Sequence, residues 1–133
     1  MITDRLAAPA DGLPFSDAVV VDGTMAFLAG QGPVADGQLV LGTFAEQARL
    51  TLSNIDQLLA RLSVTPASVI SCTCYLADLS EIDTFNTIYL EYFGPHRPAR
   101  TTVQAQMIGG ISVEITAVVA LPPAGQSGTS QEN

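Results

Sequence analysis

The stretch that decides the fold of this chain starts at residue 93 and reads Phe93-Gly94-Pro95-His96-Arg97-Pro98-Ala99-Arg100-Thr101-Thr102-Val103. A helix is expected to end at Gly94, because Pro95 cannot continue it. The two prolines favour an extended path, which places Arg100 at the head of a β-branched segment typical of a strand. A guanidinium held there, beside a stiff corner, suits bidentate binding of a carboxylate.

Two amphipathic helices are predicted before this corner. The first opens at Thr43, where Glu46 three residues later completes a capping box. The second opens around Asp78–Ser80, where Asp78 and Ser80 are both good N-cap types, and ends at Gly94. Their apolar residues recur at helical spacing, with Ala48, Leu52, Ile55, Leu59 and Leu62 in the first helix and Ile82, Phe85, Tyr89 and Tyr92 in the second.

Strands are predicted at residues 68–76, 100–105 and 111–121. Apolar runs at 18–21 and 25–29 flank Asp22-Gly23, which favours a two-residue β-hairpin, and a short strand is predicted at 38–41. The order β-β-(β)-α-β-α-β-β indicates an α+β fold with a mixed sheet and two helices on one face. We expect one domain over residues 1–121 and a disordered tail over residues 122–133.

Composition favours an oligomer. Hydrophobic residues make up 47% of the 133 residues and charged residues only 14%, which is an unusual balance for a small soluble monomer. Two helices can cover only one face of the predicted sheet. A second face buried by another subunit would account for both observations.

The charge balance excludes several function classes. The net charge of −8 argues against nucleic acid and against anionic membrane surfaces, since both are bound through Lys and Arg. All five basic residues are Arg, so no lysine is present for a Schiff base or a P-loop. Pyridoxal-phosphate catalysis is therefore excluded, and the single His gives no zinc-ligand spacing, so we expect no metal. Residues 1–12 contain no apolar core run of a secretory signal, and two Cys favour a reducing, cytoplasmic location.

A few side chains are candidates for chemistry. Glu114 interrupts an apolar strand, so its carboxylate must be paired, exposed at an edge or functional. The alternatives that stay open are a salt bridge with Arg100 and a role in a binding site. His96 follows the second helix in a proline-rich corner, which favours a surface residue over a general base. Cys72 and Cys74 have strand spacing among apolar residues and are expected to be buried core thiols.

The chain resembles the Rid/YjgF family of reactive-intermediate deaminases along residues 13–121. The most specific matching segments are Arg97-Pro98-Ala99-Arg100-Thr101-Thr102-Val103 and Val113-Glu114-Ile115. The other matching segments are Pro14-Phe15-Ser16 with Ala18, Leu28-Ala29-Gly30-Gln31, Phe85-Asn86 with Tyr89, and Tyr92-Phe93-Gly94.

The resemblance implies a chorismate-mutase-like α+β fold, in which three subunits form a homotrimeric barrel with active sites between subunits. It implies hydrolysis of small 2-imino and 2-enamino acids to 2-oxo acids and ammonia, without a cofactor. Arg100 would bind the substrate carboxylate and Glu114 would hold or activate water. The rest of the implied site consists of Phe15, Ala29, Gly30, Asn86 and Thr102.

Three positions depart from the family pattern. The family usually has Tyr where this chain has Phe15, often Ser where it has Ala29, and often Cys where it has Thr102. The first two changes remove hydroxyl groups, so we expect a drier pocket that prefers imines of apolar amino acids. The alternative is a binding module without turnover that keeps Arg100 for a metabolite carboxylate. A ribonuclease, also attached to this family, fits poorly with the net charge and the single His.

Overall fold

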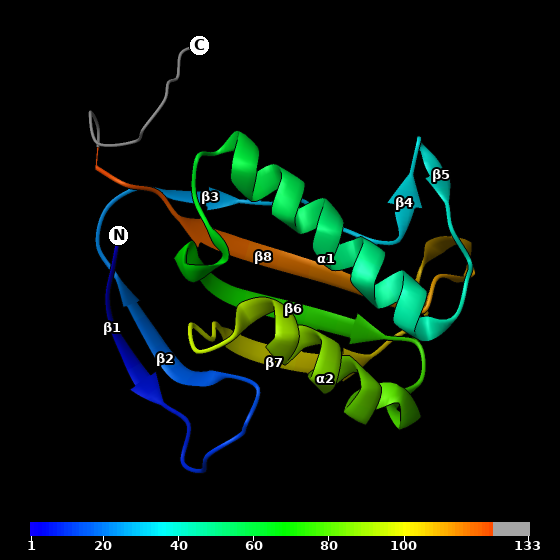
Figure 1. The fold of residues 1–133 in the computed structure, drawn as a ribbon, viewed down its shortest axis with the longest axis horizontal. Helices are drawn as coiled ribbons and strands as arrows, with labels where there is room; N and C mark the ends of the chain where they lie inside the picture. The colour runs from blue at the N-terminus through cyan, green and yellow to red at the C-terminus, as the bar shows by residue number, and fades with distance from the viewer. Residues whose placement is uncertain (124–133) are drawn as a thin grey trace.

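The computed structural model describes residues 1–123 and has an α+β architecture (Figure 1). Its centre is a four-stranded sheet in the order β3-β8-β6-β7, in which β6 runs parallel to β7 and antiparallel to β8. The helices are α1 (Phe44–Arg61) and α2 (Ile82–Phe93), and the strands are β1 (Ile2–Ala7), β2 (Ser16–Val21), β3 (Met25–Phe27), β4 (Val34–Ala35), β5 (Gln38–Leu39), β6 (Val69–Leu76), β7 (Ala99–Gln104) and β8 (Val113–Ala120).

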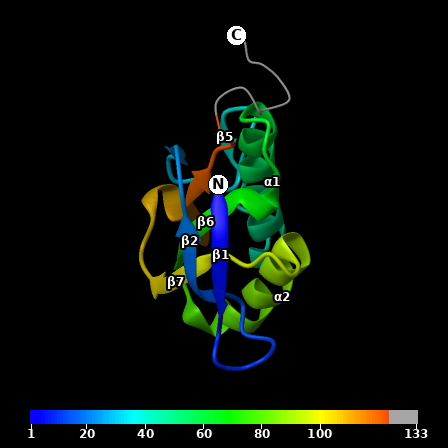
Figure 2. The same ribbon diagram turned by 90° about the vertical axis from the view of Figure 1, so that its left-hand side faces the viewer.

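Both helices pack on one face of this sheet, as predicted, and Figure 2 shows them on the same side of the strands. Side chains alternate along β6 and β8, so every second residue of these two central strands is buried beneath the helices. The core combines this sheet face with the apolar stripes of α1 and α2. Its fully buried members include Ala48, Ile55, Leu59, Val69, Cys74, Leu76, Phe85, Tyr89, Val113, Ile115 and Val119.

Local hydrogen bonds explain where α1 begins and where α2 ends, both as predicted. At the start of α1, the Thr43 hydroxyl accepts from the backbone N–H of Glu46 (3.2 Å), and the Glu46 carboxylate accepts from the backbone N–H of Thr43 (2.7 Å). This is the predicted capping box. At the end of α2, Gly94 takes a left-handed φ of 57° and donates its N–H to the carbonyl of Leu90. The chain can therefore turn from α2 towards β7.

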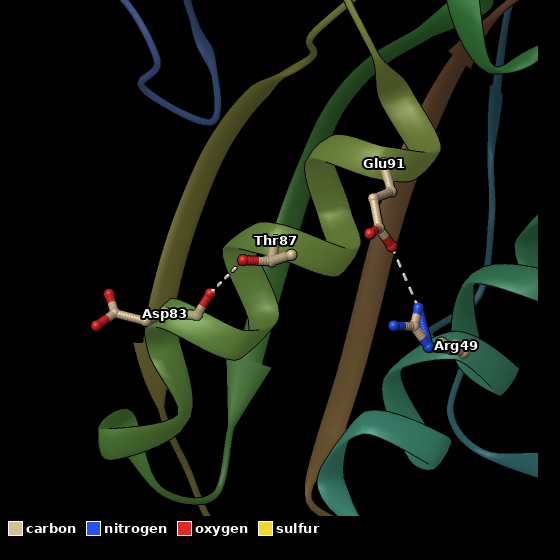
Figure 3. A network of polar contacts seen from close by, with 4 residues as sticks. All are labelled: Arg49, Asp83, Thr87 and Glu91. Atoms are coloured by element: carbon tan, nitrogen blue, oxygen red, sulfur yellow. Dashed lines mark hydrogen bonds and ion pairs between the residues drawn. The ribbon is translucent and has the colours of Figure 1, made fainter.

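An exposed ion pair joins the outer surfaces of the two helices, next to a polar contact within α2 (Figure 3). Arg49 of α1 donates to Glu91 of α2 at 3.3 Å, and Thr87 donates to the backbone carbonyl of Asp83 within α2. Both members of the ion pair are more than half exposed, so this pair contributes little to stability. Helix packing therefore depends on the buried stripes.

The other face of the sheet has no helix on it among residues 1–123. Phe27, on the edge strand β3, is 74% exposed, and Val103 of β7 is 37% exposed. The polar side chains of Thr73, Tyr75 and Glu114 point to this open face, since they alternate with the buried residues of β6 and β8. The open face is thus a mixture of exposed apolar and polar groups.

The predicted hairpin across Asp22-Gly23 is wrong. The chain does turn there, but β2 pairs with β1 and β3 pairs with β8, so the two apolar runs belong to different sheets. The backbone of Asp22 bonds to Met1 instead of closing a hairpin. The predicted strand at 38–41 forms only over Gln38–Leu39, paired with β4. Apart from Pro122 and Pro123, the predicted tail lies outside the described residues.

Candidate active site

Arg100 lies on the edge strand β7 and points under helix α2. It pairs with Cys72 of β6, whose side chain is buried beneath the helices, so the guanidinium is on that same face. Its central carbon is 4.9 Å from the ring centre of Phe85 and 4.7 Å from that of Tyr89. Contacts of this kind between a cation and aromatic rings are attractive and orient the guanidinium plane.

Two side chains hold the guanidinium in place. Nε donates to Oγ1 of Thr102 and Nη2 donates to Oδ1 of Asn86, both at 2.7 Å. Thr102 is two residues along the same strand, and Asn86 projects from α2 next to Phe85. The two predicted site residues Asn86 and Thr102 therefore lie beside Arg100, where they act on the arginine itself.

The charge of Arg100 has no carboxylate partner among residues 1–123. The only ion pair among residues 1–123 joins Arg49 to Glu91, and Nη1 of Arg100 is buried without any hydrogen-bond acceptor. A buried N–H of a cation without an acceptor is energetically costly. The contacts of Arg100 with the protein therefore leave one N–H unpaired and the positive charge uncompensated. An anionic ligand would supply both a hydrogen-bond acceptor and the opposite charge.

The corner before β7 fixes the position of Arg100. Pro98 is fully buried, and the Arg97 guanidinium donates to the carbonyls of Gly94 (3.3 Å) and Leu13 (2.6 Å). The backbone of Ser16 also bonds to the carbonyl of Pro98 at 3.0 Å. His96 is exposed at this corner, as predicted for a surface residue.

The groups beneath Arg100 are held in their neutral forms. Burial raises the pKa of the Cys72 thiol to about 11, opposed by the nearby Tyr89 hydroxyl and by the charge of Arg100. Burial also raises the pKa of Cys74 and of Tyr89 well above their ordinary values. A nucleophilic cysteine needs its thiolate, so these thiols are core residues, as predicted from the sequence.

Glu114 lies on the opposite face of the sheet from Arg100. It pairs with Tyr75 of β6, and both side chains point to the open face. Gly30 lies directly against it, because a Cβ at residue 30 would collide with the Glu114 carboxylate. The strand-like segment around Gly30 is held by Gln31, whose backbone exchanges two hydrogen bonds with Ile115 (2.8 and 2.9 Å). Ala29 precedes this contact and accepts a bond from the Gln31 side chain.

This placement overturns one alternative left open by the sequence. A salt bridge between Arg100 and Glu114 does not form within the chain, because β6 separates β7 from β8 and the two side chains point to opposite faces. The structure brings together Arg100, Asn86 and Thr102, and separately Glu114 and Gly30. It does not bring these two groups together in one copy of the chain.

Phe15 and Arg100 meet at one cavity. Both line a pocket of about 380 Å³ on the open face between the start of β2 and strands β6 and β7. Four hydroxyl-bearing residues line the same pocket, namely Ser16, Ser71, Thr73 and Thr101. The loss of a tyrosine hydroxyl at residue 15 predicted an apolar pocket wall, but these four residues place hydroxyl groups in the wall around Phe15. Sequence reasoning missed these hydroxyls, although their alternation along β6 and β7 was visible.

The sequence also did not predict that the rings of Phe85 and Tyr89 lie against the Arg100 guanidinium. Their helical spacing was visible, but it indicated only a core stripe. Within residues 1–123, no group of three or more His, Cys, Asp or Glu side chains is placed to hold a metal ion. None of the helices in this range is both long and apolar enough to cross a membrane.

The geometry is that of an α+β protein with an unpaired arginine at one edge of its sheet. The chain matches the family model described as Endoribonuclease L-PSP over residues 5–121. It is 39% identical over 125 residues to the Bos taurus protein named 2-iminobutanoate/2-iminopropanoate deaminase, which covers 92% of this chain and 90% of that protein. The chain belongs to this family, the YjgF/RidA family, which confirms the resemblance seen in the sequence.

Other relatives carry different names. Protein HMF1 of Saccharomyces cerevisiae is 34% identical over 116 residues, covering 86% of this chain and 89% of that protein. The crystal structure of YyfB, a Rid family protein of unknown function from Yersinia pestis, has a TM-score of 0.75 at 27% identity. That similarity covers 88% of this chain and 98% of the other. Membership of the family therefore leaves the activity of an individual member to be argued from its site.

Proposed function

We propose that this chain is a hydrolytic deaminase of 2-imino and 2-enamino acids, which it converts to 2-oxo acids and ammonia. The observation that carries the proposal is the guanidinium of Arg100, which is oriented by four side chains and has no carboxylate partner among residues 1–123. Relatives named for deamination of 2-iminobutanoate and 2-iminopropanoate support the substrate class.

In this proposal each polar group has one task. Arg100 binds the substrate carboxylate through N–H groups that Thr102 and Asn86 leave free. Glu114 accepts a proton from water as the water oxygen attacks the C=N carbon. Glu114 returns this proton to the nitrogen to give the carbinolamine, whose hydroxyl proton passes to the nitrogen as ammonia leaves and the 2-oxo acid forms. An enamine must first take a proton at carbon to become the imine, and no residue is assigned to that step.

The proposal requires two copies of the chain, because Arg100 and Glu114 lie on opposite faces of one sheet. The open face, with Phe27 exposed at its edge, is where a second copy would pack. A homotrimeric, chorismate-mutase-like barrel with sites between subunits would place Glu114 of one copy near Arg100 of the next. Light scattering that gives a stable monomer at micromolar concentration would contradict this assembly.

The catalytic test compares two arginine variants. Imines are generated in situ by an amino-acid oxidase, and their decay is followed with each variant. Arg100→Ala is expected to lower kcat/KM by about 10–100-fold, because charge-assisted hydrogen bonds to the substrate are lost. Arg49→Ala removes an exposed arginine of the same charge and is expected to leave the rate unchanged. Equal rates for Arg100→Ala and the unmodified protein would refute the carboxylate clamp.

A binding module without turnover is the second candidate. The observation that favours it is that one copy of the chain holds a complete arginine site but no water-activating carboxylate on the same face. Calorimetric titration with 2-oxobutanoate, set beside the imine assay, separates the two functions. Binding without faster imine decay would support the module. The endoribonuclease description of the family model is not extended to this chain, because a net charge of −8 disfavours RNA binding.

A further inference from the structure

A second pocket, with a volume of about 450 Å³, lies between the loop that joins β1 to β2 and the corner before β7. In Figure 1 this loop forms the end of the molecule beyond β1 and β2. Neither the Arg100 group nor Glu114 contributes to it. Its lining residues include Arg5, Arg97, Asp11, Leu13 and Phe15.

Two arginines meet at this pocket. Arg5 donates to the carbonyls of Arg97 (2.8 Å) and Ala67 (2.6 Å), and Arg97 donates to those of Gly94 and Leu13. Within the described part of the chain, these bonds leave Nε of Arg5 and Nη2 of Arg97 without a hydrogen-bond acceptor. Neither atom is among the fully buried unpaired atoms of residues 1–123, so both keep some exposure to solvent.

The charges of the two arginines are not neutralised within residues 1–123. No Asp or Glu oxygen lies within 4.0 Å of either guanidinium, since Arg49–Glu91 is the only ion pair there. Burial lowers the pKa of Arg5, which shows that its charge is partly withdrawn from water. Two like charges near one cavity, in a chain of net charge −8, form a local site for a carboxylate.

The rest of the pocket has two further properties. Asp11 is exposed and lines the same cavity, yet it makes no ion pair with either arginine. Leu13, Phe15 and three alanines add apolar wall. A dianion such as phosphate would be repelled by Asp11, whereas a ligand with one carboxylate and one ammonium would match both charges.

We propose that this pocket binds a small α-amino acid in its zwitterionic form. The carboxylate lies on Arg5 and Arg97, the ammonium faces Asp11, and the side chain contacts Leu13 and Phe15. Phe15 and Ser16 also line the pocket on the open face, so a bound amino acid would touch a residue of the deaminase site proposed above. The binding itself does not depend on that deaminase activity.

The test uses L-valine, its 2-oxo acid and isobutylamine, the corresponding amine, as probes of the full chain. Amide NMR signals of Ala8, Gly12 and Leu13 report this pocket, which keeps binding at Arg100 apart. Valine is expected to shift these signals saturably in the millimolar range, more tightly than the oxo acid or the amine. Asp11→Asn is expected to weaken valine binding about threefold or more, while the oxo acid is not weakened.

Two further variants complete the test. Ala10→Phe fills the pocket from an exposed position and is expected to abolish the shifts. Asp83→Asn changes the net charge equally on the distant helix α2 and is expected to change nothing. The proposal is overturned if valine causes no saturable shift, if the oxo acid binds as tightly as valine, or if Asp83→Asn acts like Asp11→Asn.

Discussion

The Nε–H of Arg100 has a single acceptor, the hydroxyl of Thr102 at 2.7 Å. Thr102→Val keeps the shape of the side chain but leaves this charged donor unpaired, which costs about 1.5–3 kcal/mol. We expect the guanidinium to lose its orientation and kcat/KM for imine decay to fall about tenfold or more. Thr102→Ser keeps the hydroxyl and should retain the rate. A serine variant as impaired as the valine variant would contradict this role for the hydroxyl.

A Cβ at Gly30 would meet the carboxylate of Glu114, which is the end of a flexible side chain and can move aside. Gly30→Ala is therefore expected to lower the free energy of unfolding by only about 0.5–1.5 kcal/mol, the cost of a displaced side-chain rotamer. Glu114→Ala should remove the clash, so the double variant Gly30→Ala/Glu114→Ala should lose less than the sum of the two single changes. Urea denaturation of all four proteins measures this coupling. Additive losses would show that the two residues do not interact.

At the scale of residues, the sequence pointed to Arg100 and Glu114 as candidates but did not show how the two side chains lie relative to each other. Alternation along a strand assigns side chains to its two faces. It does not say which face of the sheet is covered, nor which strands are neighbours. Because β6 lies between β7 and β8, and β7 is an edge strand with weak alternation, the opposite orientation of the two residues could not be predicted. The positioning role of Asn86 had no sequence signal beyond its match to the family.

Among the elements, α1 depends on its N-terminal capping box. Thr43→Ala removes the hydroxyl that accepts from the backbone N–H of Glu46 and should lower the free energy of unfolding by about 1 kcal/mol. Thr65 offers a matched control, because it also precedes a helical turn, the 3₁₀ turn Pro66–Ser68, but makes no capping bond with its side chain. Thermal unfolding followed by circular dichroism compares the variants. A loss with Thr65→Ala equal to that with Thr43→Ala would rule out a specific cap.

Strand β6 carries two buried thiols, and we expect them to lower the stability of the fold at alkaline pH. Burial raises the pKa of Cys72 from 9.0 to about 11, so above pH 9 the unfolded chain binds fewer protons than the folded one. Stability is therefore unaffected below pH 9 and falls as pH rises from about 9 to 11. Cys72→Ala/Cys74→Ala should flatten this fall between pH 9 and 10, where Tyr89 does not yet contribute. The measurement is the slope of unfolding free energy with pH, and an unchanged slope would exclude the thiols.

The elements also show where sequence patterns stop being informative. The helices were predictable because caps and apolar stripes are local signals. The pairing partners of β2 and β3 could not be predicted. Asp22-Gly23 forms the same turn whether the next strand pairs with the previous one or joins another sheet. Strand β1 was missed because Asp4 and Arg5 interrupt any apolar pattern, and its pairing with β2 depends on backbone bonds.

The whole molecule has one covered and one open sheet face, with its two candidate catalytic groups divided between them. No movement of a side chain can carry Glu114 through a strand to reach Arg100. If the chain is a deaminase, its site must therefore combine faces from two copies. The exposed apolar side chains of the open face, such as Phe27 and Val103, are consistent with such packing.

This geometry leads to a complementation experiment. Arg100→Ala and Glu114→Gln are each expected to retain about a tenth or less of the unmodified activity in imine decay. When the two variants are mixed and refolded together, some sites combine an intact Arg100 from one copy with an intact Glu114 from the next. Random cyclic assembly gives such a site about one time in four, so about a quarter of the unmodified activity should return. If each site lay within one chain, every site would still lack one group. A mixture that stays at the activity of the separate variants although light scattering shows normal assembly would therefore refute a shared site.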